Sequence, residues 1–277
     1  MATPEIFDRH LRRLRRDRAA AGYAAHAFLR DAMVEGLLER LDGVTWPFAT
    51  ALDLGCADGS LTRALRARGM KVVACDAGAR FAGAVGGVQC DEDRLPFAEA
   101  SFDLIVSAGV LDSVNDLPGA LVQCRRALRP DGLFLAAFVG AGSLARLKQT
   151  LLAADAAAGG AVPQRIHPQI DVRAAGDLLL RAGFVLSVAD SEPLDVGYPD
   201  PIRLMADLRG MAGGNLLAGQ TPPHLSRARL SALADAFAAQ ADPDGRVRER
   251  FELVYMTGWA PGPRAPEKRT GPIPRFV

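Results

Sequence analysis

The stretch from Phe48 to Arg68 limits the possible folds of this chain more than any other. An apolar run, Phe48 to Leu54, is followed by a glycine-containing turn, and the segment from Leu61 to Arg68 has the pattern of a helix. A strand that leads into such a turn lets a ligand approach the backbone, because glycine has no Cβ to obstruct it. The pattern therefore predicts an open α/β sheet whose first turn binds a nucleotide-like ligand.

Two ligand classes compete for this turn. The dinucleotide pattern G-x-G-x-x-G falls on Gly55, Ala57 and Ser60, so it fails at two positions. The pattern acid-x-G-x-G-x-G, used by enzymes that bind S-adenosylmethionine (SAM), begins at Asp53 and fails only at Ala57. A pyrophosphate avoids nearby acids, whereas the sulfonium and ammonium of SAM are attracted by them. SAM is therefore the favoured ligand, and a tight turn that holds no ligand is the remaining alternative.

Further acids follow the next strands. Lys71–Asp76 is a second apolar strand that ends in a carboxylate, which suits a ribose diol, although Asp76 could instead cap a helix. The pair Asp91 and Glu92 precedes a Leu-Pro-Phe turn, and one of these carboxylates could accept from an adenine amino group. Ser101–Ala108 is a buried strand by its apolar run. Each signal is weak alone, but the four in this order form a strong combined pattern.

In this order the segments LDLGCxxG, xxxCD, DEDxLPF and SFDLIVS resemble the class I SAM-dependent methyltransferases with a methyltransferase 11 core. Other segments are similar to the respiratory complex I assembly-factor branch, whose mitochondrial member is a SAM-binding protein arginine hydroxylase. These segments are Ile6–Arg9, Val114–Pro118, Leu128–Gly132, Arg181–Phe184, Leu204–Met211 and Tyr255–Trp259. The resemblance extends from about residue 5 to residue 261, and it includes, more distantly, the malonyl-carrier-protein methyltransferase of biotin synthesis.

The resemblance implies SAM as cofactor, no metal, and a class I Rossmann-like, mostly parallel seven-stranded sheet. The residues expected at the cofactor are Asp53, Gly55, Cys56, Ala57, Gly59, Asp76, Ala77, Asp91, Glu92 and Ala108. Many relatives carry His-Trp where this chain has Asp112-Ser113, so a mechanism that depends on that histidine is in doubt here. Asp112, His167 and Tyr198 remain as weak candidates for a catalytic base.

The N-terminal segment, residues 5 to 42, is predicted to be helical. Phe7, Leu11 and Leu14 share a helix face by their spacing. Six arginines surround that face: Arg9, Arg12, Arg13, Arg15, Arg16 and Arg18. They form either a solvated basic face, a lid over the cofactor or a dock for an acidic partner.

The domain organisation follows from the alternation of elements. Residues 1–45 are expected to form a helical cap and residues 46–260 the SAM-binding domain, with a helical insertion at 200–242. Within that domain, strands are expected at 133–139, 184–189 and 251–259, with a turn at 129–132. The proline-rich tail, 261–277, is expected to be poorly ordered.

Composition narrows the function classes. The formal net charge is +1, so no global field recruits nucleic acid or membrane. The four cysteines lack a C-x-x-C spacing and are expected to be core thiols in a reducing compartment. No signal peptide or long apolar segment is apparent, which favours the cytoplasm.

Three functions remain open. The chain could be a SAM-dependent methyltransferase, a complex I assembly factor that hydroxylates arginine, or a SAM-binding protein without catalysis. The basic N-terminal helix favours a protein acceptor, and a respiratory complex I subunit is a possible one. A hydroxylase usually needs a redox metal, but the sequence shows no His/His/carboxylate set, which argues against assigning hydroxylation from sequence alone.

Overall fold

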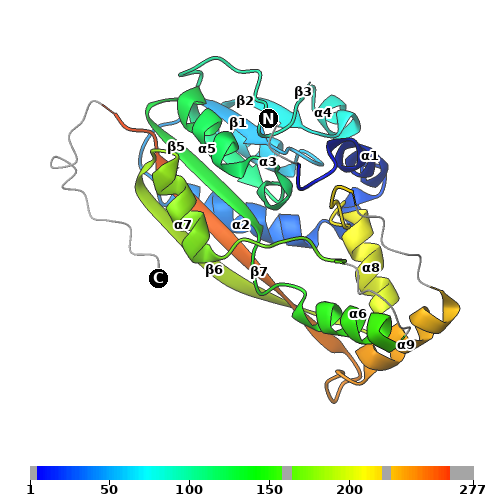
Figure 1. The fold of residues 1–277 in the computed structure, drawn as a ribbon. Coiled ribbons are helices and arrows are strands. Elements are labelled where there is room, and N and C mark those ends of the chain that lie inside the picture. Colours follow the sequence, from blue (N-terminus) through cyan, green and yellow to red (C-terminus); the bar gives the residue numbers. More distant parts are fainter. Residues whose placement is uncertain (1–4, 158–163, 220–225, 263–277) are drawn as a thin grey trace.

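A single twisted sheet with helices on both faces forms the body of the molecule (Figure 1). The computed structural model describes residues 5–157, 164–219 and 226–262. The strands are β1 (Thr50–Leu54), β2 (Lys71–Asp76), β3 (Val88–Gln89), β4 (Phe102–Ala108), β5 (Leu128–Val139), β6 (Val185–Tyr198) and β7 (Val247–Trp259). The α-helices are α1 (Arg9–Ala19), α2 (Phe28–Asp42), α3 (Ser60–Ala67), α4 (Ala79–Ala84), α5 (Leu117–Ala127), α6 (Ala145–Ala157), α7 (Val172–Arg181), α8 (Pro201–Gly210) and α9 (Arg227–Ala238). Two short 3₁₀ helices, η1 (Tyr23–His26) and η2 (Leu111–Ser113), lie between them.

The sheet has seven strands in the order β3-β2-β1-β4-β5-β7-β6. The pairs β3–β2, β2–β1, β1–β4 and β4–β5 are parallel, whereas β7 runs antiparallel to both β5 and β6. The expected mostly parallel seven-stranded sheet is confirmed. Because β1, β2, β4 and β5 run the same way, their carboxyl ends meet at one edge, where ligands of open α/β sheets bind.

Successive residues of the central strands pack into two different hydrophobic cores, one on each face of the sheet. In β1, Ala51 packs in the core that includes α2 and α3, whereas Leu52 packs in the core that includes α5 and α7. This alternation is the side-chain period of a strand, and both faces are apolar because helices cover both. The continuous apolar runs that predicted buried strands therefore have a simple physical origin.

The N-terminal helix differs from its prediction. Phe7 precedes α1 and forms a bridge with Leu217, and Leu14 is 36% exposed, so the expected apolar face of Phe7, Leu11 and Leu14 is wrong. The buried side chains of α1 include instead Arg12 and Arg16, which are 5% and 6% exposed. The prediction of a helix is confirmed, but its buried face is the charged one, because carboxylates elsewhere in the chain pair with its arginines.

Other element boundaries differ from their predictions where strand pairing outweighs local sequence signals. The strand expected at 184–189 extends to Tyr198 because it pairs along its length with β7. The turn expected at 129–132 lies inside β5, which begins at Leu128. The short elements β3 and α4 were not predicted. Helices α8 and α9 fall within the range 200–242, and the tail beyond residue 262 lies outside the described residues.

Two further sequence expectations concern the whole chain. All four cysteines are free thiols and buried, as expected for core residues. Among the described residues, no helix is long and apolar enough to cross a membrane.

Candidate functional site

The glycine turn after β1 lies at the carboxyl edge of the sheet. Gly55 and Gly59 have φ angles of 83° and 76°, and Ala57 has a φ of 43°. These left-handed conformations suit glycine, so Ala57 holds a backbone geometry that its Cβ makes costly. A Cβ at Gly55 would lie 2.5 Å from a methyl carbon of Val110, so the turn also packs too closely for a larger residue.

Asp53, the first acid of the turn, is completely buried. Its Oδ2 accepts a hydrogen bond from the hydroxyl of Thr62 at 2.5 Å, and its Oδ1 has no hydrogen-bond partner among the described residues. Burial raises the pKa of Asp53, against the lowering effect of Arg30. The carboxylate therefore orients the start of α3 through Thr62, and it lies beneath the turn.

Asp76, at the end of β2, is held by four donors. Arg16 donates from Nε and Nη2 at 2.6 and 2.5 Å, and the backbone amides of Ala57 and Gly78 donate at 3.0 and 2.7 Å. Burial alone would raise the pKa of Asp76, but the charge and hydrogen bonds of Arg16 hold it below its ordinary value. The carboxylate is therefore ionised, and it links the glycine turn, the strand end and α1. It does not cap α4, whose N-cap is Gly78.

The acids after β3 pair with the same helix. We define the acid row as Asp76, Asp91, Glu92 and Asp93, all of which are buried. Arg12 makes a two-pronged pair with Glu92, with distances of 2.7 and 2.9 Å between nitrogen and oxygen. The other pairs join Arg13 to Asp91 (2.6 Å) and Arg9 to Asp93 (2.6 and 2.7 Å). Of the interpretations open at the sequence level, the structure favours a helix that covers this edge.

Arg30, on α2, is a site residue that the sequence reasoning missed. Its guanidinium donates to three carbonyl oxygens at the strand ends: Gly55 (2.9 Å), Cys56 (2.9 Å) and Ala108 (2.5 Å). It is 3% exposed. A single arginine between the apolar residues Leu29 and Met33 of a buried helix was the available signal. These carbonyls form a site that holds a cation.

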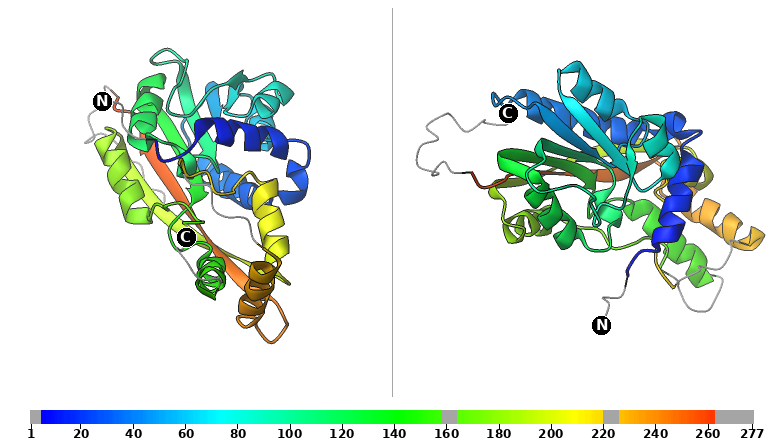
Figure 2. Two further views of the ribbon diagram at one scale, coloured as in Figure 1. Left: turned by 45° about the vertical axis from the view of Figure 1, so that its right-hand side comes forward. Right: turned by 90° about the horizontal axis from the view of Figure 1, so that it is seen from above.

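A cavity of about 500 Å³ opens beside this edge. Its walls are mostly apolar and include Leu147, Met205 and Phe251. Val139, at the end of β5, and Asp112, in η2, connect it to the carboxyl edge. Figure 2 shows α1, in dark blue, beside the yellow helix α8, and both helices contribute lining residues.

Three arginines at this cavity lack a carboxylate partner. Arg15 and Arg18 on α1 and Arg209 on α8 form no ion pair within 4.0 Å in the part of the chain that the structure describes. Burial lowers the pKa of Arg15, and the positive charge of Arg18 lowers it further. The arginines of α1 thus divide into a paired set at the acid row and an unpaired set at the cavity. The cavity has apolar walls and a cationic border.

Of the candidate bases, the structure brings Asp112 and His167 to this cavity. Burial raises the pKa of Asp112, while the nearby His167 and Arg12 lower it. His167 stacks edge-on against Phe7, with ring centroids 5.4 Å apart. Tyr198 is not among the lining residues: it is buried beside Asp207, and burial raises its pKa, so it is a packing residue.

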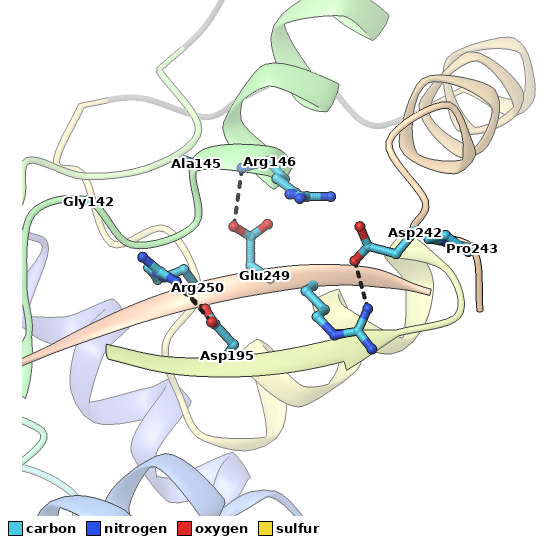
Figure 3. Close-up of a pocket in the computed structure, with 9 residues that line it drawn as sticks. Gly142, Ala145, Arg146, Asp195, Asp242, Pro243, Glu249 and Arg250 are labelled. Carbon is cyan, nitrogen blue, oxygen red and sulfur yellow. Dashed lines mark hydrogen bonds and ion pairs between the residues drawn. The ribbon is translucent and has the colours of Figure 1, made fainter. Parts of the chain in front are cut away.

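A second cavity, of about 540 Å³, lies at the far end of the β6–β7 hairpin (Figure 3). Two of its arginines are in ion pairs: Arg250 with Asp195 at 2.8 Å, and Arg248 with Asp242 at 2.8 Å. Arg146 donates instead to the carbonyl oxygen of Gln240 at 2.6 Å. Glu249 accepts hydrogen bonds from the backbone amides at the start of α6. Two ion pairs and the hydrogen bonds of Glu249 thus join the strands to the start of α6 at this end of the sheet. No group of three or more potential metal ligands occurs among the described residues.

Comparisons with known proteins agree with this geometry. The family model "Methyltransferase domain" matches residues 52–136. The chain is 33% identical to the human mitochondrial arginine-hydroxylase NDUFAF5, over 93% of this chain and 77% of that protein. It is also 33% identical to the malonyl-[acyl-carrier protein] O-methyltransferase of Halorhodospira halophila, over 93% and 90% of the two chains.

Solved structures share the fold at low sequence identity. A chain in the complex between the Haloferax volcanii Trm112 methyltransferase activator and a methyltransferase aligns with a TM-score of 0.53 and 16% identity, covering 91% of this chain and 99% of that one. A Haemonchus contortus phosphoethanolamine N-methyltransferase, solved with S-adenosylhomocysteine, also aligns with a TM-score of 0.53 and 16% identity, covering 90% of this chain and 60% of that one.

Proposed function

Because this chain belongs to the SAM-dependent methyltransferase family that includes NDUFAF5 and the malonyl-[acyl-carrier protein] O-methyltransferases, we propose that it transfers a methyl group from SAM to an anionic group carried by a protein. SAM is the cofactor of this family. The reaction and the acceptor are the proposal, and the unpaired arginines of the apolar cavity support it.

The residues at the carboxyl edge fit a cationic nucleoside. The carbonyls of Gly55, Cys56 and Ala108 already hold a guanidinium, so they suit the ammonium of SAM. The ionised carboxylate of Asp76 suits a ribose diol, and Asp91 or Glu92 suits the adenine amino group. We propose that Gly55 and Gly59 allow close approach of the ligand, with Ala57 and Ala77 as small neighbours. When bound, SAM supplies an electrophilic methyl group on its sulfonium.

The charge of the cavity supports an anionic acceptor. Arg15, Arg18 and Arg209 would repel an incoming guanidinium or ammonium, and they would attract a carboxylate or another anion. Apolar walls next to these cations suit an acyl chain or a hydrophobic segment that bears the anion. An ionised carboxylate needs no base before it accepts a methyl group, which agrees with the lack of a strong base candidate. Positioning by the arginines then supplies the catalytic advantage.

A second candidate is arginine hydroxylation with a role in complex I assembly. The identity to proteins named arginine-hydroxylase favours it. The sequence resemblance to the complex I assembly-factor branch suggests a subunit of that complex as the protein acceptor. The name of the human relative places that protein in mitochondria.

Mass spectrometry of acceptors distinguishes these functions. The purified protein is incubated with methyl-labelled SAM and either a malonyl-loaded acyl carrier protein or an arginine-containing peptide. We expect the label, and a mass gain of one methylene group, on the anionic acceptor alone. Label on the arginine peptide, or a gain of one oxygen atom, would contradict the proposal.

Substitution of the cavity arginines tests the charge argument. We expect Arg15→Gln combined with Arg18→Gln to raise the KM for the anionic acceptor by about tenfold or more, because charged hydrogen bonds are lost, and to leave SAM affinity unchanged. Arg250→Gln, which removes a paired arginine at the second cavity, is the matched control and should change neither value. Equal KM values for all three proteins would refute the assignment of the cavity.

A further inference from the structure

The arginines of α1 occupy the carboxylates that a nucleoside would use. Arg9, Arg12, Arg13 and Arg16 are spaced three, one and three residues apart, so they lie on one side of the helix. Each pairs with a member of the acid row. The helix is therefore bound at this edge through its cationic side chains.

Asp76 has no acceptor position left for a ribose. A carboxylate offers about four lone-pair sites, and Asp76 already accepts four hydrogen bonds. Two of these come from the backbone of Ala57 and Gly78, which belong to the turn and the strand end. The other two come from the side chain of Arg16. A ribose diol and Arg16 thus compete for the same oxygen atoms.

Arg16 also covers an aromatic face at this edge. Its guanidinium carbon lies 5.1 Å from the centroid of the Phe81 ring, on α4. Phe81 in turn stacks edge-on with Tyr23, so the ring is fixed in place. A planar cation on a ring face is a favourable contact, and a nucleobase uses the same kind of surface. Arg16 therefore takes both a carboxylate and a ring face from an incoming nucleoside.

The two ends of α1 are attached in different ways. Its N-terminal side is held by hydrogen bonds between Phe7 and Asn115 at 2.7 and 2.9 Å. Its C-terminal end leads through a turn to Gly22, where an added Cβ would meet nothing within 4 Å. The end that carries Arg16 therefore leads into a connection with free space at Gly22, between the buried residues Ala19 and Tyr23.

From these contacts we propose that α1 is an autoinhibitory latch, in which Arg16 is an internal competitor that SAM must displace from Asp76. The latch rests on the proposed SAM site. Binding of the nucleoside breaks the Arg16–Asp76 pair and loosens the C-terminal end of α1. Cofactor binding then also changes the adjacent cavity, because Arg15 and Arg18 lie on the same helix and line that cavity.

Hydrogen exchange of the full chain with S-adenosylhomocysteine tests this directly. We expect amide exchange to slow in residues 55–59 and to quicken in residues 12–19. Slower or unchanged exchange in α1 together with protection of 55–59 would overturn the latch while leaving the SAM site intact. No protection at 55–59 would overturn the SAM site, and the latch with it.

Titration calorimetry with SAM gives an independent readout. Arg16→Gln should tighten binding by about tenfold, the gain expected when a binding-competent state rises from about one tenth of the population to nearly all of it. Arg16→Lys, which keeps the charge and loses the two-pronged geometry, should fall between this variant and the parent protein. Arg126→Gln, on α5, removes an exposed ion pair with Glu99; this variant is the control and should bind like the parent. Weaker or unchanged binding by Arg16→Gln would refute the competition.

Discussion

At the scale of single residues, the site is organised by buried carboxylates that need hydrogen-bond or ion-pair partners. Asp76 is 1% exposed, and an unpaired buried charge is costly, so its two-pronged pair with Arg16 and its two backbone donors are needed for the fold. The same carboxylate is the proposed ribose ligand. Stability and cofactor binding therefore depend on the same side chain. In the proposed latch, the ribose of SAM replaces Arg16 as the partner of Asp76, so the carboxylate is not left unpaired.

The pH dependence of stability tests the state of Asp76. Because its folded pKa lies below the ordinary value of 3.8, its stabilising effect is present above that pH and is lost as the pH falls through the folded pKa. We expect Asp76→Asn to lower the free energy of unfolding at pH 7 by about 3–5 kcal/mol, since Arg16 is left buried and unpaired. The difference from the parent should shrink below pH 4 in urea titrations.

An exposed pair provides the comparison for this measurement. Asp195 pairs with Arg250 and its side chain is 43% exposed, so Asp195→Asn should change the free energy of unfolding by less than about 1 kcal/mol. If Asp76→Asn cost no more than Asp195→Asn, or if its cost were independent of pH, the ion pair at the sheet edge would not contribute as described.

At the scale of elements, the packing of α2 against the sheet depends on a position without a side chain. A Cβ at Gly36 would lie 2.5 Å from the hydroxyl oxygen of Tyr255 on β7. Arg40, one turn later, lies over the same ring, with its guanidinium carbon 3.7 Å from the centroid. The tyrosine ring is therefore held between a glycine and a cation, and α2 is brought close enough for Arg30 to reach the strand ends.

Substitution of this glycine should be destabilising despite the better helix propensity of alanine. Gly36→Ala is expected to lower the free energy of unfolding by about 1–3 kcal/mol through overpacking against Tyr255. Gly83→Ala, in α4, meets nothing within 4 Å and should stabilise the protein by up to about 1 kcal/mol. Chemical unfolding of both variants measures the difference. Equal effects of the two substitutions would show that the contact with Tyr255 is unimportant.

The sequence predicted elements well where one local pattern decided the structure. The first turn, the acids at the strand ends and the parallel sheet follow from apolar runs that stop at glycines and carboxylates. The buried face of α1 could not be predicted, because it depends on pairing with acids about sixty to eighty-four positions away in the chain. Likewise, the length of β6 is set by its partner β7, and Arg30 acquires its role only when α2 packs across the strand ends.

At the scale of the whole molecule, the cofactor edge and the apolar cavity are joined by one helix. The side of α1 with Arg12 and Arg16 binds the acid row, whereas Arg15 and Arg18 line the cavity. The same helix lies beside α8 (Figure 2). Any movement of α1 therefore changes both places together.

The central claim is that a sulfonium nucleoside binds across the carboxyl ends of β1, β2 and β4. A crystal structure of the protein with SAM is the most direct test. The account predicts the nucleoside between the turn at Gly55 and the carboxylate of Asp76, with Arg16 turned away from that carboxylate. Density for the nucleoside elsewhere, or an Asp76 carboxylate still paired with Arg16 at saturating ligand, would contradict it.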